Sequence, residues 1–241
     1  MGFTRVKKTT REEWLKERGK GLGGSDIAAL MGYDTNRTSV DLYNEKTGLV
    51  EREKIDNRFV EYGTKCERLL REMFLLDYPT LEVYHNENEI LIGDNEWQRA
   101  SLDGEIIVNE PTTIYSYKIP KGDEIDAKNR VELKQGEKGV LEIKTAEIMS
   151  SKSLAEWHNQ IPMKYYCQVL HYLLVTNYDF FVLRVKLKFI KASGCVVSEI
   201  RDYCVRKENL MLDIKLVDTK EKDFWYNHIE KKTPPSLVIN L

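Results

Sequence analysis

Apolar residues recur at helical spacing in several parts of the chain. The clearest case is the segment 60–76, in which Leu69, Leu70 and Phe74 fall on one side of a helix. Pro79 ends this segment, because proline lacks the backbone N–H that a continuing helix needs. Capping residues and apolar spacing predict further helices at residues 11–18, 27–31, 38–46, 161–176 and 206–231.

Short apolar runs predict β-strands between and after these helices. Residues 81–92 have the pattern of a strand pair, and residues 97–108 that of two short strands around the turn-like tripeptide Leu102-Asp103-Gly104. Further strands are predicted at residues 140–144, 179–187 and 195–205. Helices come first, followed by strands, a helix and more strands. This order predicts an α/β (α+β) domain with a central mixed sheet flanked by helices.

The segment 109–139 differs from its surroundings. It is rich in Lys, Glu and Asp and contains one β-prone run, residues 112–117. We interpret it as a hairpin or loop inserted between two strands of the sheet. Because an insertion can protrude without moving its parent strands, we predict a single domain over residues 1–241 that ends in a C-terminal helix at 206–231.

Composition excludes some functions and leaves others open. Charged residues make up 32% of the 241 residues and nearly balance, so the net charge is −2. The overall charge therefore gives no sign of nucleic-acid binding, although a local basic patch would suffice for it. No apolar run reaches membrane-spanning length, so no membrane contact is expected.

The cysteines do not form a metal-binding pattern. Cys66, Cys167, Cys195 and Cys204 include no Cys-x-x-Cys pair, which argues against a zinc ribbon or an iron–sulfur cluster. We expect free thiols, as in proteins of the reducing cytoplasm.

Asp103 and the run Glu142-Ile143-Lys144 are the main candidates for catalysis. Because side chains alternate along a strand, Glu142 and Lys144 point to one face, while Ile143 points into the core and keeps its carbonyl available. Two carboxylates and a carbonyl oxygen suit a hard cation such as Mg²⁺. Lys144 would orient or help to deprotonate a metal-bound water and stabilise charge on the phosphate under attack. Such residues also form ordinary ion pairs on strands, so the pattern alone leaves both interpretations open.

A glycine-rich connection precedes the predicted helix at 27–31. Its residues Gly23-Gly24-Ser25 would let backbone N–H groups approach an anion, and Arg18 would add a two-point contact. The alternative is an ordinary helix cap beside a surface arginine.

Two other helices carry candidate residues. Glu67 either supplies another carboxylate or pairs with Arg71, which lies four positions further along the same helix. Gln168 and Tyr172 share one helix face and are candidates to line the same site, with Tyr172 in the core as the alternative.

Five short motifs occur in the order typical of one family and span about residues 11–190. They are Trp14-x-x-x-Arg18 with Gly23-Gly24-Ser25-Asp26, Tyr62-Gly63-x-x-x-Glu67, Ala100-Ser101-Leu102-Asp103-Gly104, Leu141-Glu142-Ile143-Lys144, and Tyr166-Cys167-Gln168-Val169-Leu170-His171-Tyr172. In these motifs the chain resembles the lambda-exonuclease/YqaJ-like viral recombinase family of restriction-endonuclease-like PD-(D/E)XK nucleases. The 38 residues between Asp103 and Glu142 exceed what is usual in that family.

The resemblance implies a Mg²⁺-dependent 5′-to-3′ exonuclease, a phosphodiester hydrolase that digests linear double-stranded DNA and leaves 3′ single-stranded overhangs for phage-type recombination. It also implies a ring-shaped homotrimer, a single-strand-annealing recombinase as partner, and a phage or prophage origin with action in the bacterial cytoplasm.

The same resemblance implies roles for individual residues. Catalysis would fall to Asp103, Glu142, Lys144 and Glu67. One or two ions of Mg²⁺, or of Mn²⁺, would be held by Asp103, Glu142, the Ile143 carbonyl and Glu67. The terminal 5′-phosphate would be bound by Arg18, Ser25 and Gln168, and Tyr172 would face the DNA.

Three alternatives remain open. The first is another nuclease of the same superfold, of the RecB-like or Cas4-like type, which would differ in substrate polarity. The second is a catalytically silent protein that binds DNA ends and assists recombination; the presence of Asp103, Glu142 and Lys144 argues against it. The third is an interaction module with accidental matches, which requires five coincidences in order.

Overall fold

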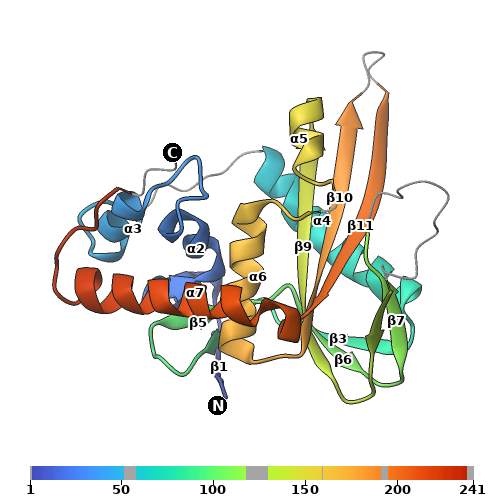
Figure 1. Cartoon of the computed structure of the whole chain (residues 1–241), viewed down its shortest axis with the longest axis horizontal. Helices are drawn as coiled ribbons and strands as arrows, with labels where there is room; N and C mark the ends of the chain where they lie inside the picture. The colour runs from blue at the N-terminus through green and yellow to red at the C-terminus, as the bar shows by residue number, and fades with distance from the viewer. Residues whose placement is uncertain (1, 52–57, 118–129, 159, 191–194, 238–241) are drawn as a thin grey trace.

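The computed structural model describes residues 2–51, 58–117, 130–158, 160–190 and 195–237. Its central sheet has the strand order β11-β10-β9-β6-β3 (Figure 1). The strands are β3 (Leu81–Tyr84), β6 (Gly104–Val108), β9 (Lys138–Ile148), β10 (Phe180–Ile190) and β11 (Val196–Arg206). β9 and β10 run parallel, whereas the other neighbours are antiparallel. The predicted fold class, a mixed α/β domain of restriction-endonuclease-like type, is confirmed.

A second, smaller sheet lies beside the first. It contains β1 (Thr4–Lys7), β2 (Leu22–Gly23), β4 (Glu89–Ile92) and β5 (Gln98–Ala100) in the order β1-β4-β5-β2. The expected pairing within residues 81–92 is wrong, because β3 pairs with β6 and β4 pairs with β1 and β5. Arg5 of β1 joins the two sheets, since its guanidinium donates to Glu89 and to Glu105 of β6, each at 2.6 Å.

Helices cover both faces of the central sheet. α4 (Arg58–Asp77) packs on one face, and α6 (Met163–Thr176), followed outward by α2 (Gly24–Leu30) and α7 (Met211–Asp223), packs on the other (Figure 1). The alternation of β9 divides the core between these layers. Val140 belongs to the α6 side, whereas Leu141 and Ile143 belong to the α4 side.

The helix ends follow the capping residues of the sequence. Before α1 (Arg11–Gly19), the Thr10 hydroxyl accepts from the Glu13 N–H at 3.2 Å and the Glu13 carboxylate accepts from the Thr10 N–H at 3.2 Å. α3 (Ser39–Lys46) begins after Thr38 in the same way. A short helix that was not predicted, α5 (Ser151–Ala155), follows β9.

The C-terminal segment is not the single α-helix expected at 206–231. It begins with a 3₁₀ turn (Lys207–Leu210), continues as α7 and ends as a π-helical turn (Phe224–Ile229). In the described residues no helix is both long and apolar enough to cross a bilayer.

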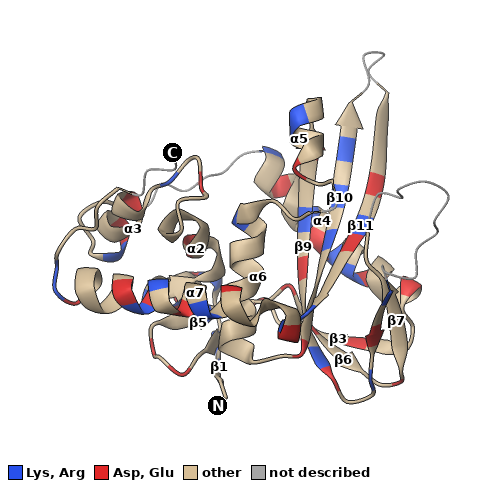
Figure 2. Ribbon diagram, viewed as in Figure 1, with Lys and Arg blue, Asp and Glu red and all other residues tan. Residues whose placement is uncertain are grey.

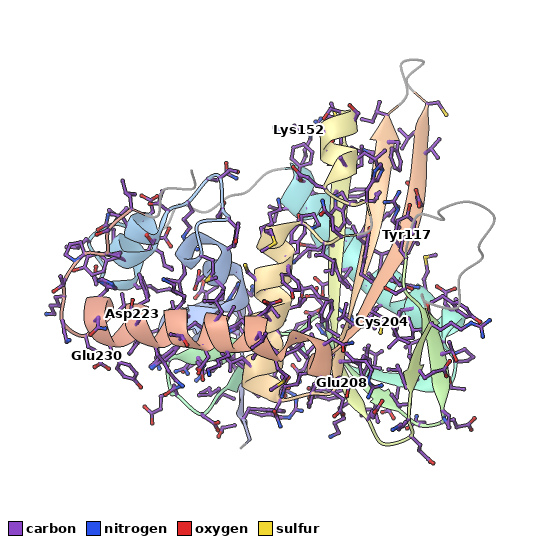
Figure 3. The ribbon with its side chains drawn as sticks, in the orientation of Figure 1. Tyr117, Lys152, Cys204, Glu208, Asp223 and Glu230 are labelled. Carbon is purple, nitrogen blue, oxygen red and sulfur yellow. The ribbon has the colours of Figure 1, made fainter. Side chains whose placement is uncertain are left out.

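The segment between β6 and β9 contains a hairpin of β7 (Thr112–Tyr115) and β8 (Arg130–Leu133). Residues 118–129 of the expected insertion lie outside the described residues. The hairpin contacts β11, and a cavity of about 750 Å³ lies between them. Tyr117 and Cys204, both labelled in Figure 3, are among the residues that line it.

A buried charged network ties α7 to the rest of the domain. His171 of α6 is fully buried, with Nδ1 2.6 Å from Glu221 of α7 and Nε2 2.9 Å from the Arg99 carbonyl oxygen. Since both ring nitrogens face acceptors, the imidazole donates twice and is positively charged. Burial alone would lower the pKa of His171, but Glu221 holds it above the ordinary histidine value.

Replacing Glu221 should therefore destabilise the protein. We expect Glu221→Ala to lower the free energy of unfolding by about 3–5 kcal/mol near pH 6, because it leaves a buried imidazolium unpaired. Since the folded-state pKa of His171 is raised, its contribution is complete below the ordinary value of about 6.5 and is lost as pH rises through the folded-state value. Urea titrations at several pH values measure both effects. Glu230→Ala, which removes an exposed carboxylate further along the same segment, should have little effect. A loss equal in the two variants would contradict this assignment.

Candidate active site

The candidate site opens where β6 stops pairing with β9. The last pair in this register joins Gly104 to Leu141. Asp103, the residue just before β6, then takes the place of a strand partner: its carboxylate accepts from the Ile143 N–H at 2.7 Å. Ile143 is 6% exposed and packs in the core, as expected. The chain thus brings Asp103 to the edge of β9 beside Glu142.

Glu142 lies fully buried on the face of β9 toward α6. Its Oε1 accepts from Nε2 of Gln168 at 2.6 Å and forms an ion pair with the Lys144 ammonium. Its Oε2 is also buried, and it has no hydrogen-bond partner among the described residues. A buried carboxylate oxygen without a partner is costly, so this atom is suited to a positively charged ligand.

Charge crowding shifts the pKa values at the site. Burial first, and then the Asp103 carboxylate, raise the pKa of Glu142 to about 8, despite the opposing charge of Lys144. Burial and Asp103 also raise the pKa of Glu67 to about 7. Burial alone would lower the pKa of Lys144, but Glu142 and Asp103 hold it above its ordinary range. The lysine therefore stays charged at neutral pH.

Glu67 reaches the site from α4, where it pairs with Arg71 as one of the two interpretations expected. Its carboxylate accepts from Nη2 of Arg71 at 2.7 Å, the partner four positions along the helix. Arg71 also donates through Nε to the Asp103 carbonyl oxygen at 2.7 Å. Arg71 therefore joins α4 to the Asp103 turn; the sequence indicated only its pairing with Glu67.

Gln168 and Tyr172 of α6 support Glu142 from the interior. The Gln168 amide donates to Glu142 and, at 2.8 Å, to the Tyr172 hydroxyl. Tyr172 is only 3% exposed, so the expectation that it faces DNA is corrected: it lies in the core, and its hydroxyl holds Gln168. Helical spacing placed both residues on one face but did not show which layer covers that face.

Gly24 explains why α2 approaches α6 so closely. A Cβ at this position would lie 2.6 Å from a ring carbon of Tyr172 and 2.9 Å from Cγ of Gln168. Glycine is therefore required for packing at this point, whether or not its backbone meets an anion. The contact also places Ser25, the next residue, beside the layer that holds Glu142.

Arg18 and Ser25 come together as expected, with Nη2 of Arg18 3.0 Å from the Ser25 hydroxyl. The Arg18 guanidinium also lies over the Trp14 ring, 5.1 Å from its centre. The N–H of Gly23 is not available to an anion, because it donates to the Asp26 carboxylate at 3.0 Å. Gln168, expected to bind the same phosphate, lies against Gly24 and donates to Glu142.

A divalent cation such as Mg²⁺ would need several oxygen ligands at this site. No three Asp, Glu, His or Cys side chains converge as a ready-made metal cluster in the described part of the chain. Asp103 and Glu142 nevertheless offer two carboxylates at one strand edge, and the Oε2 atom of Glu142 is buried without a partner. This arrangement fits one cation. Glu67 would join such a site only on release from Arg71.

Comparison with known proteins identifies the family. The model of the YqaJ-like viral recombinase domain matches residues 13–179. The chain belongs to this family. The match contains Arg18, Ser25, Glu67, Asp103, Glu142, Lys144 and Gln168.

A YqaJ-like relative and two solved structures resemble the chain. The chain is 28% identical over 172 residues to the uncharacterized protein YqaJ of Bacillus subtilis (strain 168), an alignment that covers 71% of this chain and 44% of that protein. The chain therefore spans less than half of that relative's length. The alkaline exonuclease LHK-Exo of Laribacter hongkongensis superposes with a TM-score of 0.55 at 15% identity, covering 92% of this chain and 95% of that one. LHK-Exo in complex with dAMP gives 0.58 at 15% identity, covering 92% and 94%. At this identity the likeness shows the fold.

Removing the charge of Glu142 should stabilise this YqaJ-like domain in the absence of metal. Because its folded-state pKa is raised from 4.5 to about 8, Glu142 contributes stability at low pH that is lost as pH rises through about 8. In Glu142→Gln, the carboxylates of Glu67 and Asp103 balance the charges of Arg71 and Lys144. We expect a higher unfolding temperature than wild type at pH 9 with EDTA, and a smaller difference at pH 5.

The exposed Glu156→Gln serves as the control and should show no such pH dependence. If Glu142→Gln were equally stable relative to wild type at both pH values, Glu142 would not be a buried, charge-crowded carboxylate.

Proposed function

We propose that this YqaJ-like chain is a metal-dependent deoxyribonuclease that digests linear duplex DNA from the 5′ end and leaves 3′ overhangs. One observation carries the proposal. On a single strand edge, the buried Oε2 of Glu142 has no partner in the described residues, while Asp103 and the charged Lys144 lie beside it. Family membership and the fold of an alkaline exonuclease support the same assignment.

The proposed cofactor is Mg²⁺, with Mn²⁺ as the alternative, held by Asp103, Glu142 and the Ile143 carbonyl; a second ion would require Glu67. Such an ion, when bound, polarises the scissile phosphate and lowers the pKa of an attacking water. Gln168 fixes the rotamer of Glu142, and the Ile143 N–H fixes that of Asp103.

Lys144 acts as a charged donor in this proposal. Its pKa is raised by the neighbouring carboxylates, so at neutral pH it carries its proton and stabilises negative charge on the phosphate. This makes it a poor base, and the attacking water must lose its proton to another acceptor.

Arg18 and Ser25 are proposed to hold the terminal 5′-phosphate. They lie 3.0 Å apart, and Arg18 forms no ion pair with an acidic side chain among the described residues. A guanidinium and a hydroxyl at this spacing offer donors to one phosphate group. Gly24 brings this pair next to Gln168 and hence to the metal ligands.

The main test uses linear duplex DNA labelled separately at the 5′ and 3′ ends. We expect early release of the 5′ label with Mg²⁺, none with EDTA, and a fall in rate of about a hundredfold or more in Lys144→Ala, since one charged transition-state contact contributes on that scale. Lys222→Ala, which removes an exposed lysine of α7, is the matched control. Early release of the 3′ label would instead favour a RecB-like or Cas4-like nuclease of the same superfold. Tight binding of ends without release of either label would indicate the silent end-binding protein.

The 5′-phosphate pocket has its own test. Wild type should digest 5′-phosphorylated ends faster than 5′-hydroxyl ends, and Arg18→Ala should remove most of this preference by slowing only the phosphorylated substrate. Lys16→Ala removes the same charge from an exposed position of the same helix and should leave the ratio unchanged. Equal rates of wild type on both ends would exclude the pocket.

A homotrimeric ring and a single-strand-annealing recombinase as partner remain proposals that rest on the family resemblance alone. Because the chain covers only 44% of the YqaJ relative, the activity and partners of such a longer protein are also proposals. The solution mass of this chain distinguishes a trimer from a monomer.

A further inference from the structure

We propose that a basic surface formed by β1 and α1 binds the phosphate backbone of duplex DNA at a place separate from the 5′ end. The inference rests on the proposed nuclease function and adds a second contact between the chain and its substrate. We name this area the α1 lysine surface and define it by Lys7, Lys8, Lys16 and Lys20. These lysines, with one threonine and two glutamates, line a hollow of about 370 Å³.

Positive charge is concentrated at the start of the chain. Residues 1–20 contain seven Lys or Arg residues and three Glu residues, a net charge of +4, whereas the whole chain has −2. α7, by contrast, has Lys and Asp or Glu residues mixed along its length (Figure 2). A local excess of one sign attracts a partner of the opposite charge, whatever the net charge of the chain.

A single carboxylate serves most of the basic groups around the hollow. Glu17 is 8% exposed and lies 3.1 Å from the Lys8 ammonium and 2.8 Å from that of Lys20. The Arg99 guanidinium lies 3.7 Å from the same carboxylate. The other carboxylate, that of Glu13, accepts from two backbone N–H groups before α1. Because three cations share Glu17, the hollow keeps an excess of positive charge.

Lys7 and Lys16 complete the surface. Both side chains are exposed, and neither forms an ion pair with an acidic side chain in the described part of the chain. Glu89 lies opposite Lys7 in the strand register, but Arg5 already donates to its carboxylate at 2.6 Å. The two ammonium groups are therefore available to phosphate oxygens.

The α1 lysine surface and the proposed 5′-phosphate pocket lie on different sides of one helix. Arg11 and Arg18 lie over the Trp14 ring, 3.9 and 5.1 Å from its centre. Lys16 and Lys20 are four positions apart and share another side, since Lys16 points about 200° away from Arg18. A helix is about 10–12 Å across, and duplex DNA carries one charge per about 1.7 Å of its axis. A duplex held at Arg18 therefore brings further phosphates within reach of the lysines.

The residues of the hollow favour a duplex over a single strand. None of the seven described residues that line it is aromatic. Sites for single strands, by contrast, combine basic groups with rings on which the bases stack. Lysines contact phosphates as point charges, and contacts to phosphates carry no sequence information. We therefore expect the α1 lysine surface to bind duplexes of any sequence, with open or closed ends.

The test measures duplex binding in EDTA, where no cleavage interferes. A fluorescently labelled duplex with both ends closed by hairpin loops is titrated with the full chain at several KCl concentrations, and the Kd is obtained from the anisotropy. Each phosphate contact contributes about 0.9 to the slope of log Kd against log salt concentration. We expect Lys7→Gln and Lys16→Gln each to lower this slope by about 0.9 and to raise the Kd more at low salt than at high salt.

Lys215→Gln and Lys220→Gln are the matched controls. They remove the same charge from exposed positions among the acidic residues of α7, and both should keep the slope of the wild type. Lys16→Gln should weaken 5′-phosphorylated and 5′-hydroxyl open duplexes equally, because Lys16 contacts the backbone and not the terminal phosphate.

The outcomes separate this inference from the proposed function. If the chain cleaves DNA but Lys7→Gln and Lys16→Gln keep the wild-type slope, the α1 lysine surface is wrong and the nuclease proposal stands. If no metal supports cleavage but the slope falls in these two variants and not in the controls, the surface stands alone.

Two further results would overturn the inference. An effect of the lysine variants that is limited to duplexes with open ends would assign these lysines to the 5′-phosphate pocket. Weaker binding of polyglutamate by the two variants, with unchanged binding of the closed duplex, would assign the surface to an acidic protein segment instead of DNA.

Discussion

The site depends on the removal of the Glu142 carboxylate from water. A carboxylate at 0% exposure is tolerated only if its environment supplies positive charge and donors. Lys144, two positions along β9, supplies the charge, and Gln168 of α6 supplies a donor. Gly24 lets α2 pack closely against the helix that carries this donor. Residues of β9 and α6 thus surround this one side chain, and one of its oxygens has no partner among the described residues.

Much of this arrangement could be predicted from local sequence. The capping box at Thr10, the long helix α4 and the strand alternation that directs Ile143 into the core follow from short-range rules. The convergence of Asp103 on Glu142 was predicted from motif order, because spacing alone leaves an exposed ion pair equally acceptable. Each of these features depends on residues only a few positions apart, or on a pattern that the family shares.

What the sequence did not predict depends on distant partners. Residues 81–92 contain two strands, but these strands do not pair with each other. β3 pairs with β6 and β4 pairs with β1, and both partners are distant from them in the sequence. Tyr172 has a helical spacing that suits either a DNA-facing or a core position, and only the packing of α2 on α6 decides between them. The C-terminal segment turns from α to π geometry at Phe224, and no pattern in its sequence indicates this.

Because β9 pairs with β10, the sheet that contains the site extends beyond the residues that the family model matches. The family match ends at residue 179, and β10 begins at Phe180, so the parallel neighbour of the strand bearing Glu142 and Lys144 lies just beyond it. Glu221, which neutralises the buried His171, lies further beyond. A fragment that ended at residue 179 would retain the candidate active-site residues and lose β10 and β11, the two strands on one side of β9. The contacts that hold this chemistry in place therefore extend beyond the stretch that the family model matches.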